Sequence, residues 1–367
     1  MIKKVCILTT AHPVFDIRIY YKQARSLIKT GYKLTLIAQH NIDEEKDNIR
    51  IIALPQAKNR IKRMLYLPWK AYILALKHNA DVYHFHDPEL IPVGLMLKLR
   101  GKKVIYDVHE DVPRQILNKV WINKNLRTTI SRLYEALENW AAKRFNYIIG
   151  ATPKICERFS KINEKTENIN NYPLLNELFD NALQKCKQSE ICYIGGISKE
   201  RGIVELIESL DCVNVKLNLA GGFSSSTLRK ELTLKRGWEK VIEYGHVDRM
   251  EVKKILERSF AGIVLFHDRP NHVNAQPNKM FEYMSAGIPV ISSYFPLWKV
   301  IVEKNNCGLC VNPKNSKEIS KAINWLLDNP SKAIEMGLNG RKAVEEKYNW
   351  EKEEGKLFKI YGELADL

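Results

Sequence analysis

Residues 274–291 read NAQPNKMFEYMSAGIPVI, and the proline and glycine positions in this stretch predict a short helix followed at once by a buried strand. Pro277 suits the first turn of a helix and Gly287 suits its C-terminal end. The apolar run that starts at Pro289 is typical of a parallel strand covered on both faces. A helix that leads directly into such a strand is the repeating unit of a parallel α/β sheet.

The same alternation of short apolar runs and helical segments recurs along the whole 367-residue chain. A capping box at Asp248 and Glu251 opens one of the helices, and another is expected over 15–30. Two successive series of this kind predict the α/β class, with two doubly wound, Rossmann-like domains facing a cleft. The expected strands are 5–10, 33–38, 50–54, 82–85, 104–108 and 147–151, then 191–195, 215–220, 241–244, 262–266, 289–292 and 309–311.

Asparagine and proline interrupt the alternation at 170–173, which predicts the junction between the two domains. The predicted domains are residues 1–170 and 171–348. Residues 349–367 belong to a helical tail longer than one sheet layer needs, so we expect a C-terminal helix that crosses back to the first domain.

The chain is strongly basic, with 58 Lys and Arg against 42 Asp and Glu, a net charge of +16 and a pI near 9.3. This balance favours anionic partners, which include nucleic acid, acidic lipid and phosphorylated substrates. No apolar run approaches the roughly 20 residues of a membrane-spanning helix. The basic start followed by a short apolar run is expected to be a strand and not a signal peptide. The seven cysteines are scattered, and Cys307-x-x-Cys310 lacks a second pair, so we expect a cytoplasmic protein without a bound metal.

Three strands of the second half run directly into glycine at their carboxyl ends, where parallel α/β sheets bind ligands. The glycines are Gly195-Gly196, Gly221-Gly222 and Gly245. Each alone is equally typical of a tight turn, but three together favour a nucleotide site whose amides meet phosphate. Neither GxGxxG after the first strand nor GxxxxGK[ST] occurs, which disfavours dinucleotide enzymes and P-loop NTPases.

Charged residues accompany these glycines. The helix that begins near Pro277 and Asn278 offers free amides to an anion, and Lys279 adds a positive charge. Glu282 can accept hydrogen bonds from ribose hydroxyls, unless it is an exposed helix glutamate or a partner of Lys279. Arg201 is expected to open the next helix and to bind a diphosphate, its alternative being a solvated surface arginine.

Titratable residues also lie at three strand ends of the first half. Strand alternation places His84 and His86 on one side, which suggests zinc, but no third ligand stands at a recognisable spacing. Such side chains can instead bind sugar hydroxyls or move protons, although a structural role is an equal alternative for any one histidine. The candidate catalytic residues are His86, His109, Asp16 and Arg18.

Residues 58–70, KNRIKRMLYLPWK, interleave cations with large apolar side chains. This pattern predicts a helix that lies on an anionic membrane surface without spanning it, in the acceptor domain. The alternative is a cationic helix face that packs on its own domain. The candidate membrane and acceptor residues are Lys58, Arg60, Lys62, Arg63 and Trp69.

Over essentially the whole chain these residues resemble family 4 of the retaining glycosyltransferases, which have the GT-B fold. PNKMFEYM at 277–284 with GIPV at 287–290 is similar to the donor-binding helix and strand of that family. The resemblance implies that Glu282 binds the nucleotide ribose, as the second glutamate of a Glu-x7-Glu pair whose first position here is Asn274. It places His86 near the transferred sugar, and it adds His246 to the donor site.

The family also has an arginine and a lysine about five residues apart that bind the diphosphate. Here Gly196 stands at the first position and Arg201 at the second, so Lys279, Lys199 or Arg18 would have to supply the missing cation. No Asp-x-Asp motif occurs, and the resemblance therefore implies a metal-independent enzyme without a cofactor.

The implied reaction is the transfer, with retention, of a sugar from a UDP-sugar or GDP-sugar to a saccharide. Residues 12–18 replace the glycine-rich acceptor loop of many relatives and resemble a polysaccharide-assembly subgroup. We therefore expect a role in bacterial capsule, exopolysaccharide or O-antigen synthesis, with a polyprenyl-diphosphate-linked acceptor, on the inner face of the cell membrane. The alternatives are a sugar-nucleotide epimerase or hydrolase of the same fold and a basic nucleic-acid-binding protein; we expect no nucleic acid partner, because no recognised module is present.

Overall fold

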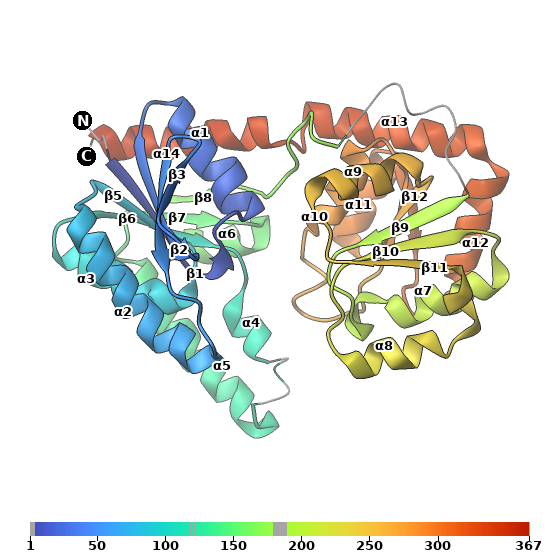
Figure 1. Cartoon of the computed structure of the whole chain (residues 1–367), viewed down its shortest axis with the longest axis horizontal. Coiled ribbons are helices and arrows are strands. Elements are labelled where there is room, and N and C mark those ends of the chain that lie inside the picture. The colour runs from blue at the N-terminus through green and yellow to red at the C-terminus, as the bar shows by residue number, and fades with distance from the viewer. Residues whose placement is uncertain (1–3, 118, 120–121, 179–188, 367) are drawn as a thin grey trace. The chain divides into compact units, whose positions relative to one another are not determined.

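The computed structural model describes residues 4–117, 119, 122–178 and 189–366, and it divides the chain into two compact units (Figure 1). Unit 1 comprises Met1–Asn171 and Glu351–Leu367, and unit 2 comprises Tyr172–Trp350. The first boundary falls within the junction expected at 170–173. The second places the C-terminal residues with unit 1.

Unit 1 is built on an eight-stranded sheet in the order β3-β4-β2-β1-β5-β6-β7-β8, parallel except where β3 pairs with β4. All six strands expected in the first half are present. The short edge strands β3 and β8 were not predicted, because neither carries an apolar run. The strands are β1 (Lys4–Pro13), β2 (Lys33–Gln39), β3 (Glu44–Lys46), β4 (Ile49–Leu54), β5 (Val82–Phe85), β6 (Lys103–Val108), β7 (Tyr147–Gly150) and β8 (Thr166–Asn168).

The helices α2 (Arg60–His78), α3 (Ile91–Leu99) and α5 (Lys124–Ala142) cover one face of this sheet and share a single apolar cluster with it. The short helices α4 (Val112–Ile116) and α6 (Pro153–Ser160) follow β6 and β7. On the other face, α14 (Trp350–Asp366) packs through buried Leu357, Ile360 and Tyr361. The Tyr361 hydroxyl lies 3.0 Å from Nδ1 of His84 on β5, so this helix closes the polar side of the sheet.

The segment 15–30, predicted as one helix, contains two helices of different type. A π-helix, η1 (Ile17–Ala24), comes first, and the α-helix α1 (Arg25–Lys29) follows. Asp16 caps the π-helix, because its carboxylate accepts hydrogen bonds from the backbone N–H groups of Arg18 and Ile19 at 2.8 and 2.9 Å. Turns of π-helix occur often at functional sites, and this one lies directly after the end of β1.

Unit 2 contains a fully parallel six-stranded sheet in the order β11-β10-β9-β12-β13-β14 (Figure 1). The strands are β9 (Glu190–Ile194), β10 (Lys216–Ala220), β11 (Val241–Gly245), β12 (Ala261–Val264), β13 (Val290–Ser293) and β14 (Gly308–Val311). The helices are α7 (Ile203–Ser209), α8 (Ser226–Thr233), α9 (Arg249–Arg258), α10 (Asn278–Ser285), α11 (Pro296–Lys304), α12 (Ser316–Asp328) and α13 (Pro330–Glu346).

Two helix starts in unit 2 differ from the prediction. Arg201 does not open α7; it ends the short 3-10 helix η4 (Lys199–Arg201). Gly202 separates the two helices because its φ of +65° lies in the left-handed region, which an α-helix cannot contain. Pro277 is the capping residue before α10 and not its first residue, with an extended ψ of 125°.

The glycine turns after β9 and β10 lie against each other. Gly221 has a φ of +137°, and a Cβ added there would lie 2.0 Å from the Gly195 carbonyl oxygen. That oxygen belongs to backbone, so the contact cannot be relieved by a side-chain movement. Glycine is therefore required at this position for both conformation and space.

We expect Gly221→Ala to lower the free energy of unfolding by at least about 2 kcal/mol, because it combines backbone strain with a steric clash. Urea denaturation followed by circular dichroism measures the change. Gly355→Ala is the matched control: Gly355 is exposed within α14 and a Cβ there meets no heavy atom within 4 Å. The control should gain up to about 1 kcal/mol of helix propensity. An unchanged urea midpoint for Gly221→Ala would contradict the expectation.

Candidate active site

The three glycine turns of unit 2 are joined through their backbones. The amide of Gly195 donates to the Ala220 carbonyl at 2.8 Å, and the amide of Gly221 donates to the Gly245 carbonyl at 2.7 Å. These bonds place the carboxyl ends of β9, β10 and β11 next to one another. The predicted convergence of the three turns is therefore present, and it exposes backbone where a parallel sheet binds its ligands.

Lys279 extends from the first turn of α10 toward this edge. A Cβ added at Gly195 would lie 3.7 Å from the Lys279 Nζ atom. The ammonium lies 3.6 Å from the centre of the Tyr193 ring and 5.7 Å from that of Phe266. It is buried, and within the described residues Nζ has no hydrogen-bond partner.

Burial, followed by the nearby positive charge of Arg201, lowers the pKa of Lys279 well below its ordinary value. Aromatic rings offset only part of the cost of burying an ammonium. A buried donor without an acceptor, directed at glycine-lined backbone, is the arrangement expected of an anion site before its ligand binds.

Arg201 approaches the same turn from η4. Its Nη1 atom donates to the Gly196 carbonyl at 3.3 Å, and its guanidinium lies 5.3 Å from the centre of the Phe266 ring. In the part of the chain that the structure describes, no carboxylate forms an ion pair with either Arg201 or Lys279. Two basic side chains without acidic partners among the described residues thus meet at Gly195-Gly196.

Glu282, one turn further along α10, is held by an arginine that the sequence analysis missed. The Arg249 Nη1 atom lies 2.7 Å from Oε1 of Glu282, and its Nε and Nη2 atoms donate to Glu177 at 2.6 and 2.9 Å. Arg249 is the first residue of α9, where the helix dipole disfavours a cation. This unfavourable position of Arg249 is the signal by which the sequence could have indicated a carboxylate partner for it.

The other candidates for the donor site are His246, Asn274, Asn278 and Lys199. A Cβ on Gly222 would lie 2.6 Å from His246 Nε2, so His246 covers that turn. Asn274 and Asn278 are exposed. Lys199 does not supply the missing cation, because it forms an ion pair with Glu231 at 2.6 Å.

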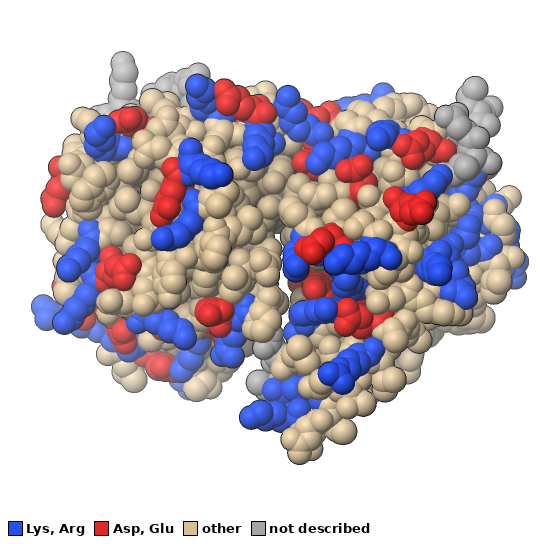
Figure 2. Space-filling model, turned by 180° about the vertical axis from the view of Figure 1, so that it is seen from behind, with Lys and Arg blue, Asp and Glu red and all other residues tan. Residues whose placement is uncertain are grey.

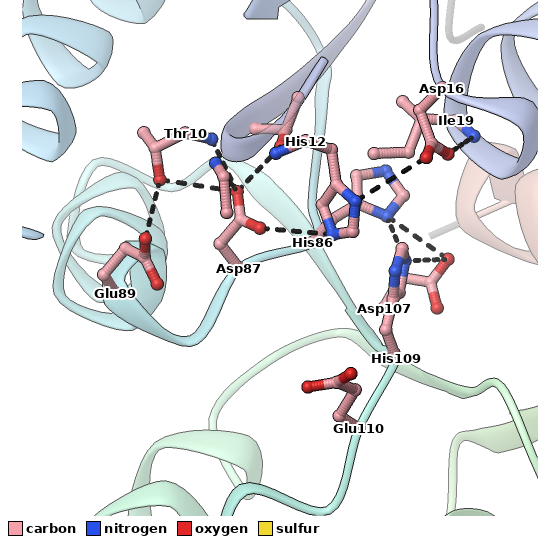
Figure 3. Close-up of polar contacts among 12 residues, drawn as sticks. Thr10, His12, Asp16, Ile19, His86, Asp87, Glu89, Asp107, His109 and Glu110 are labelled. Atoms are coloured by element: carbon pink, nitrogen blue, oxygen red, sulfur yellow. Dashed lines mark hydrogen bonds and ion pairs between the residues drawn. The ribbon is translucent and has the colours of Figure 1, made fainter. Parts of the chain in front are cut away.

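In unit 1, the carboxylate of Asp107 near the end of β6 lies beside His86 and His109 (Figure 3). Arg18 donates to both of its oxygens at 2.9 and 3.1 Å, and Gln23 donates to it at 2.6 Å. Burial would raise the pKa of Asp107, but Arg18 and His109 outweigh it and lower that pKa well below its usual range. The third contact of Arg18 is the Ile169 carbonyl at 2.9 Å. The expectation that Arg18 could bind the diphosphate is therefore wrong, because its guanidinium is buried and paired with Asp107.

His86 lies beside Asp107 and is fully enclosed. Its Nδ1 atom is 2.9 Å from His109 Nε2, and its ring stacks on His84 with the centres 4.7 Å apart. Burial lowers the pKa of His86 well below its ordinary value, so this imidazole is neutral at pH 7. The strand alternation that placed His84 and His86 on one side is confirmed.

His12 is the accessible histidine of this group, and the candidate list omitted it. Figure 3 shows it between two carboxylates: it lies 3.6 Å from Asp16 and 3.5 Å from Asp87. Burial alone would lower its pKa, but hydrogen bonding to Asp16 and the charges of Asp87 and Glu110 raise it. Its side chain is 31% exposed against 15% for His109, which makes His12 the better placed of the two to meet a substrate.

The fold supplies the third polar group that the His-x-His spacing lacked. Ligand atoms of His84, His86 and Asp107 lie within 4.8 Å of one another. Both oxygens of Asp107 already accept hydrogen bonds from Arg18, and Gln23 adds another, so this carboxylate is compensated by protein donors. This favours a structural role for the cluster.

The predicted surface at 58–70 forms the first half of α2, which Asn59 caps. Lys58, Arg60 and Lys62 are exposed, and Trp69 is 55% exposed. Arg63 differs from the expectation, because it lies 3.2 Å from Glu89 in an ion pair. Among the described helices, none is both long enough and apolar enough to cross a membrane.

Comparisons with known proteins agree with this architecture. The model for glycosyl transferases group 1 matches residues 176–343, and the model for Glycosyltransferase Family 4 matches residues 18–171. An uncharacterized glycosyltransferase of Methanocaldococcus jannaschii is 28% identical over 183 residues, 47% of this chain. The matched region spans 45% of that relative, so the chain covers about half its length.

Two solved structures share the fold over nearly their whole length. A sucrose-phosphate synthase from Thermosynechococcus elongatus superposes with a TM-score of 0.78 at 19% identity, covering 99% of both chains. HepE from Anabaena, solved with UDP and glucose, gives 0.74 at 14% identity and covers 100% of both. Two doubly wound parallel sheets of this kind define the GT-B glycosyltransferase fold. The chain belongs to the glycosyltransferases of the family 4 type.

The ion pair between Arg18 and Asp107 allows a direct test of the polar interior of unit 1. We expect Arg18→Met to cost about 3–5 kcal/mol of stability, because it leaves a buried carboxylate without its counter-ion. The double variant Arg18→Met/Asp107→Leu should lose clearly less. Chemical denaturation of the four proteins of this cycle gives the coupling energy. Additive losses in the double variant would contradict a buried, mutually compensating pair.

Proposed function

We propose that this protein transfers a sugar from a nucleotide-diphosphate sugar to a saccharide acceptor, with the donor bound in unit 2. One observation carries the proposal: Lys279 and Arg201, both without a carboxylate partner among the described residues, meet at the Gly195-Gly196 turn. A diphosphate supplies the acceptors that Lys279 lacks and the charge that Arg201 requires.

The chemistry follows from the charge that develops on the leaving group. As the bond between the sugar and the phosphate breaks, negative charge grows on the departing diphosphate, and preorganised cations stabilise it. Lys279, Arg201 and the N-terminal amides of α10 provide this stabilisation, so we propose a metal-independent reaction. We further propose retention, with the departing phosphate assisting attack from the same face; an inverted anomeric product in an NMR time course would exclude it.

Uridine is the base that we propose for the donor. The support is that HepE from Anabaena was solved with UDP and glucose. Glu282 would accept hydrogen bonds from the ribose hydroxyls while Arg249 holds its carboxylate in place at 2.7 Å. An arginine that orients a ligand-binding carboxylate acts through that carboxylate, as outer-shell partners do in other sites.

For the acceptor we propose a polyprenyl-diphosphate-linked saccharide of a bacterial surface polysaccharide, reached at the cytoplasmic face of the membrane. The support is that Trp69 on α2 is exposed, as are Lys58, Arg60 and Lys62 at and before the start of that helix. Such a mixture suits a helix that lies in the headgroup region of anionic lipid. His12, with its raised pKa and partial exposure, is the side chain of unit 1 that we propose to contact the acceptor.

A thermal-shift panel of UDP, GDP and ADP tests the proposal. We expect UDP to raise the melting temperature, since a ligand at 100 times its Kd adds about 2.7 kcal/mol. Arg201→Ala should abolish most of this shift and reduce turnover roughly 10²–10³-fold, by analogy with the loss of one preorganised donor. The control is Arg236→Ala, an exposed arginine of unit 2.

No shift with any of the three nucleotides would contradict nucleotide binding by unit 2. Conversion of a UDP-sugar at full speed without an acceptor would instead indicate an epimerase or hydrolase of the same fold.

Lys279 predicts proton uptake when the nucleotide binds. Its pKa is lowered in the free protein, and a bound diphosphate raises it, so binding takes up a proton at any pH between the two values. Isothermal titration calorimetry with UDP in Tris and in Hepes measures this uptake from the difference in buffer ionisation heats. Lys279→Met should bind UDP more weakly and without uptake. Equal proton uptake in the variant would assign the proton to another group.

A further inference from the structure

The outward face of α5 carries an apolar stripe that the proposed function does not use. Its residues recur at intervals of four and three and therefore lie along one side of the helix, over about 21 Å at 1.5 Å per residue. Their exposed fractions run from 38% to 67%. We call this set the α5 stripe: Leu126, Ile130, Leu133, Leu137 and Trp140.

A different face of the same helix packs against the rest of unit 1. Ser131, Glu138, Ala141 and Ala142 are buried there, and the two alanines belong to the apolar cluster beneath α2 and α3. The α5 stripe is therefore not part of the core. An isolated exposed leucine needs no explanation, but five large apolar side chains in a row indicate a surface that is covered in use.

The exposed charged residues on α5 and directly after it are all basic. Lys124 and Arg132 are exposed on the helix, and Lys143 and Arg144 are exposed directly after it. The only two acids between 124 and 142 are held by arginines: Arg114 pairs with Glu135 at 2.5 Å, and Arg158 pairs with Glu138. The free end of α5 projects at the lower edge of Figure 2, where blue and tan side chains predominate.

Trp140 and Arg144 form a unit at the C-terminal end of the stripe. The Arg144 guanidinium lies 3.8 Å from the centre of the indole ring, and its Nη1 atom donates to the Trp140 carbonyl at 2.6 Å. A large aromatic ring covered by a cation is amphipathic, and such groups favour the boundary between lipid headgroups and acyl chains.

A second copy of the chain fits this surface poorly. The spacing of the α5 stripe resembles a coiled-coil seam, whose stability depends on opposite charges beside the apolar positions. Arg127 and Lys143 occupy those flanking positions, and no acid is available to face them. Anionic headgroups, in contrast, complement the exposed basic residues on α5 and directly after it.

We propose that the α5 stripe inserts into the interface of an anionic lipid bilayer, as a second contact besides the surface of α2. The two helices pack on the same side of the unit 1 sheet with α3 between them, so both outward faces lie on that side of unit 1 (Figure 1). The inference rests on the membrane part of the proposed function, and it names a second helix that must take part.

The test uses the full chain and vesicles of phosphatidylglycerol and phosphatidylcholine, with pure phosphatidylcholine vesicles as the uncharged comparison. We expect Leu133→Ser/Leu137→Ser to reduce co-sedimentation with the anionic vesicles roughly tenfold or more, because two inserted side chains are lost. Both residues are exposed, so the fold should be kept. The matched control is Ile334→Ser/Leu338→Ser on α13. The exposed fractions of these two residues are 51% and 45%.

Tryptophan quenching by brominated phosphatidylglycerol then assigns the contact to a helix. We expect Trp140→Phe to remove part of the quenching, and Trp69→Phe on α2 to remove a separate part. If Leu133→Ser/Leu137→Ser binds anionic vesicles as the unaltered chain does, or if only Trp69 is quenched, the inference is overturned. A concentration-dependent dimer that the same variant dissociates, without any vesicle binding, would assign the α5 stripe to a second copy and overturn it as well.

These outcomes are separable from those of the proposed function. Nucleotide binding in the thermal-shift panel does not involve α5, so it should be equal in the α5 variant and in the unaltered chain. Vesicle binding that depends on α5 without any nucleotide shift would retain the inference and reject the transferase. If nucleotides raise the melting temperature but vesicles bind through α2 alone, nucleotide binding is supported and the inference about α5 is rejected.

Discussion

A buried charge must be compensated inside the protein, and the two units meet this constraint in opposite ways. In unit 1 the carboxylate of Asp107 receives hydrogen bonds from Arg18 and Gln23, and this pairing holds the end of β6 to η1. In unit 2 the amino group of Lys279 is also buried, but it faces two aromatic rings and the positive charge of Arg201. Asp107 therefore has its positively charged partner within the protein, whereas Lys279 has no anionic partner among the described residues. This asymmetry is why we assign the ligand charge to unit 2.

The alternation of elements could be predicted from the sequence because parallel strands buried on both faces appear as continuous apolar runs. The edge strands β3 and β8 could not, since their three residues each are mostly polar. Arg201 and Lys279 could be chosen as candidates because Arg201 follows the glycines after β9 and Lys279 follows the proline before α10, whereas only the structure shows that they meet. The pair between Arg18 and Asp107 was not, because 89 positions separate them and only the order β1-β5-β6 brings their strand ends together.

The α5 stripe illustrates a different limit of sequence analysis. Apolar residues at intervals of three and four are typical of any helix face that packs on a core, so the pattern alone does not distinguish inside from outside. Only the burial of Glu138, Ala141 and Ala142 shows which side of α5 meets the rest of unit 1. Likewise, only the structure shows where the basic residues of the chain lie. Some cations, such as Arg158, compensate buried acids, whereas those beside the α5 stripe remain on the surface.

The division of the chain also has a consequence for its synthesis. Unit 2 is one continuous segment, Tyr172–Trp350, inserted into unit 1, and α14 near the C-terminal end of the chain covers one face of the unit 1 sheet. Because domains fold as units while the chain emerges from the ribosome, unit 2 has all of its residues before unit 1 does. Until α14 arrives, Tyr361 cannot reach His84, and the polar side of the first sheet stays open. The unit that is synthesised first is thus the one that is completed last.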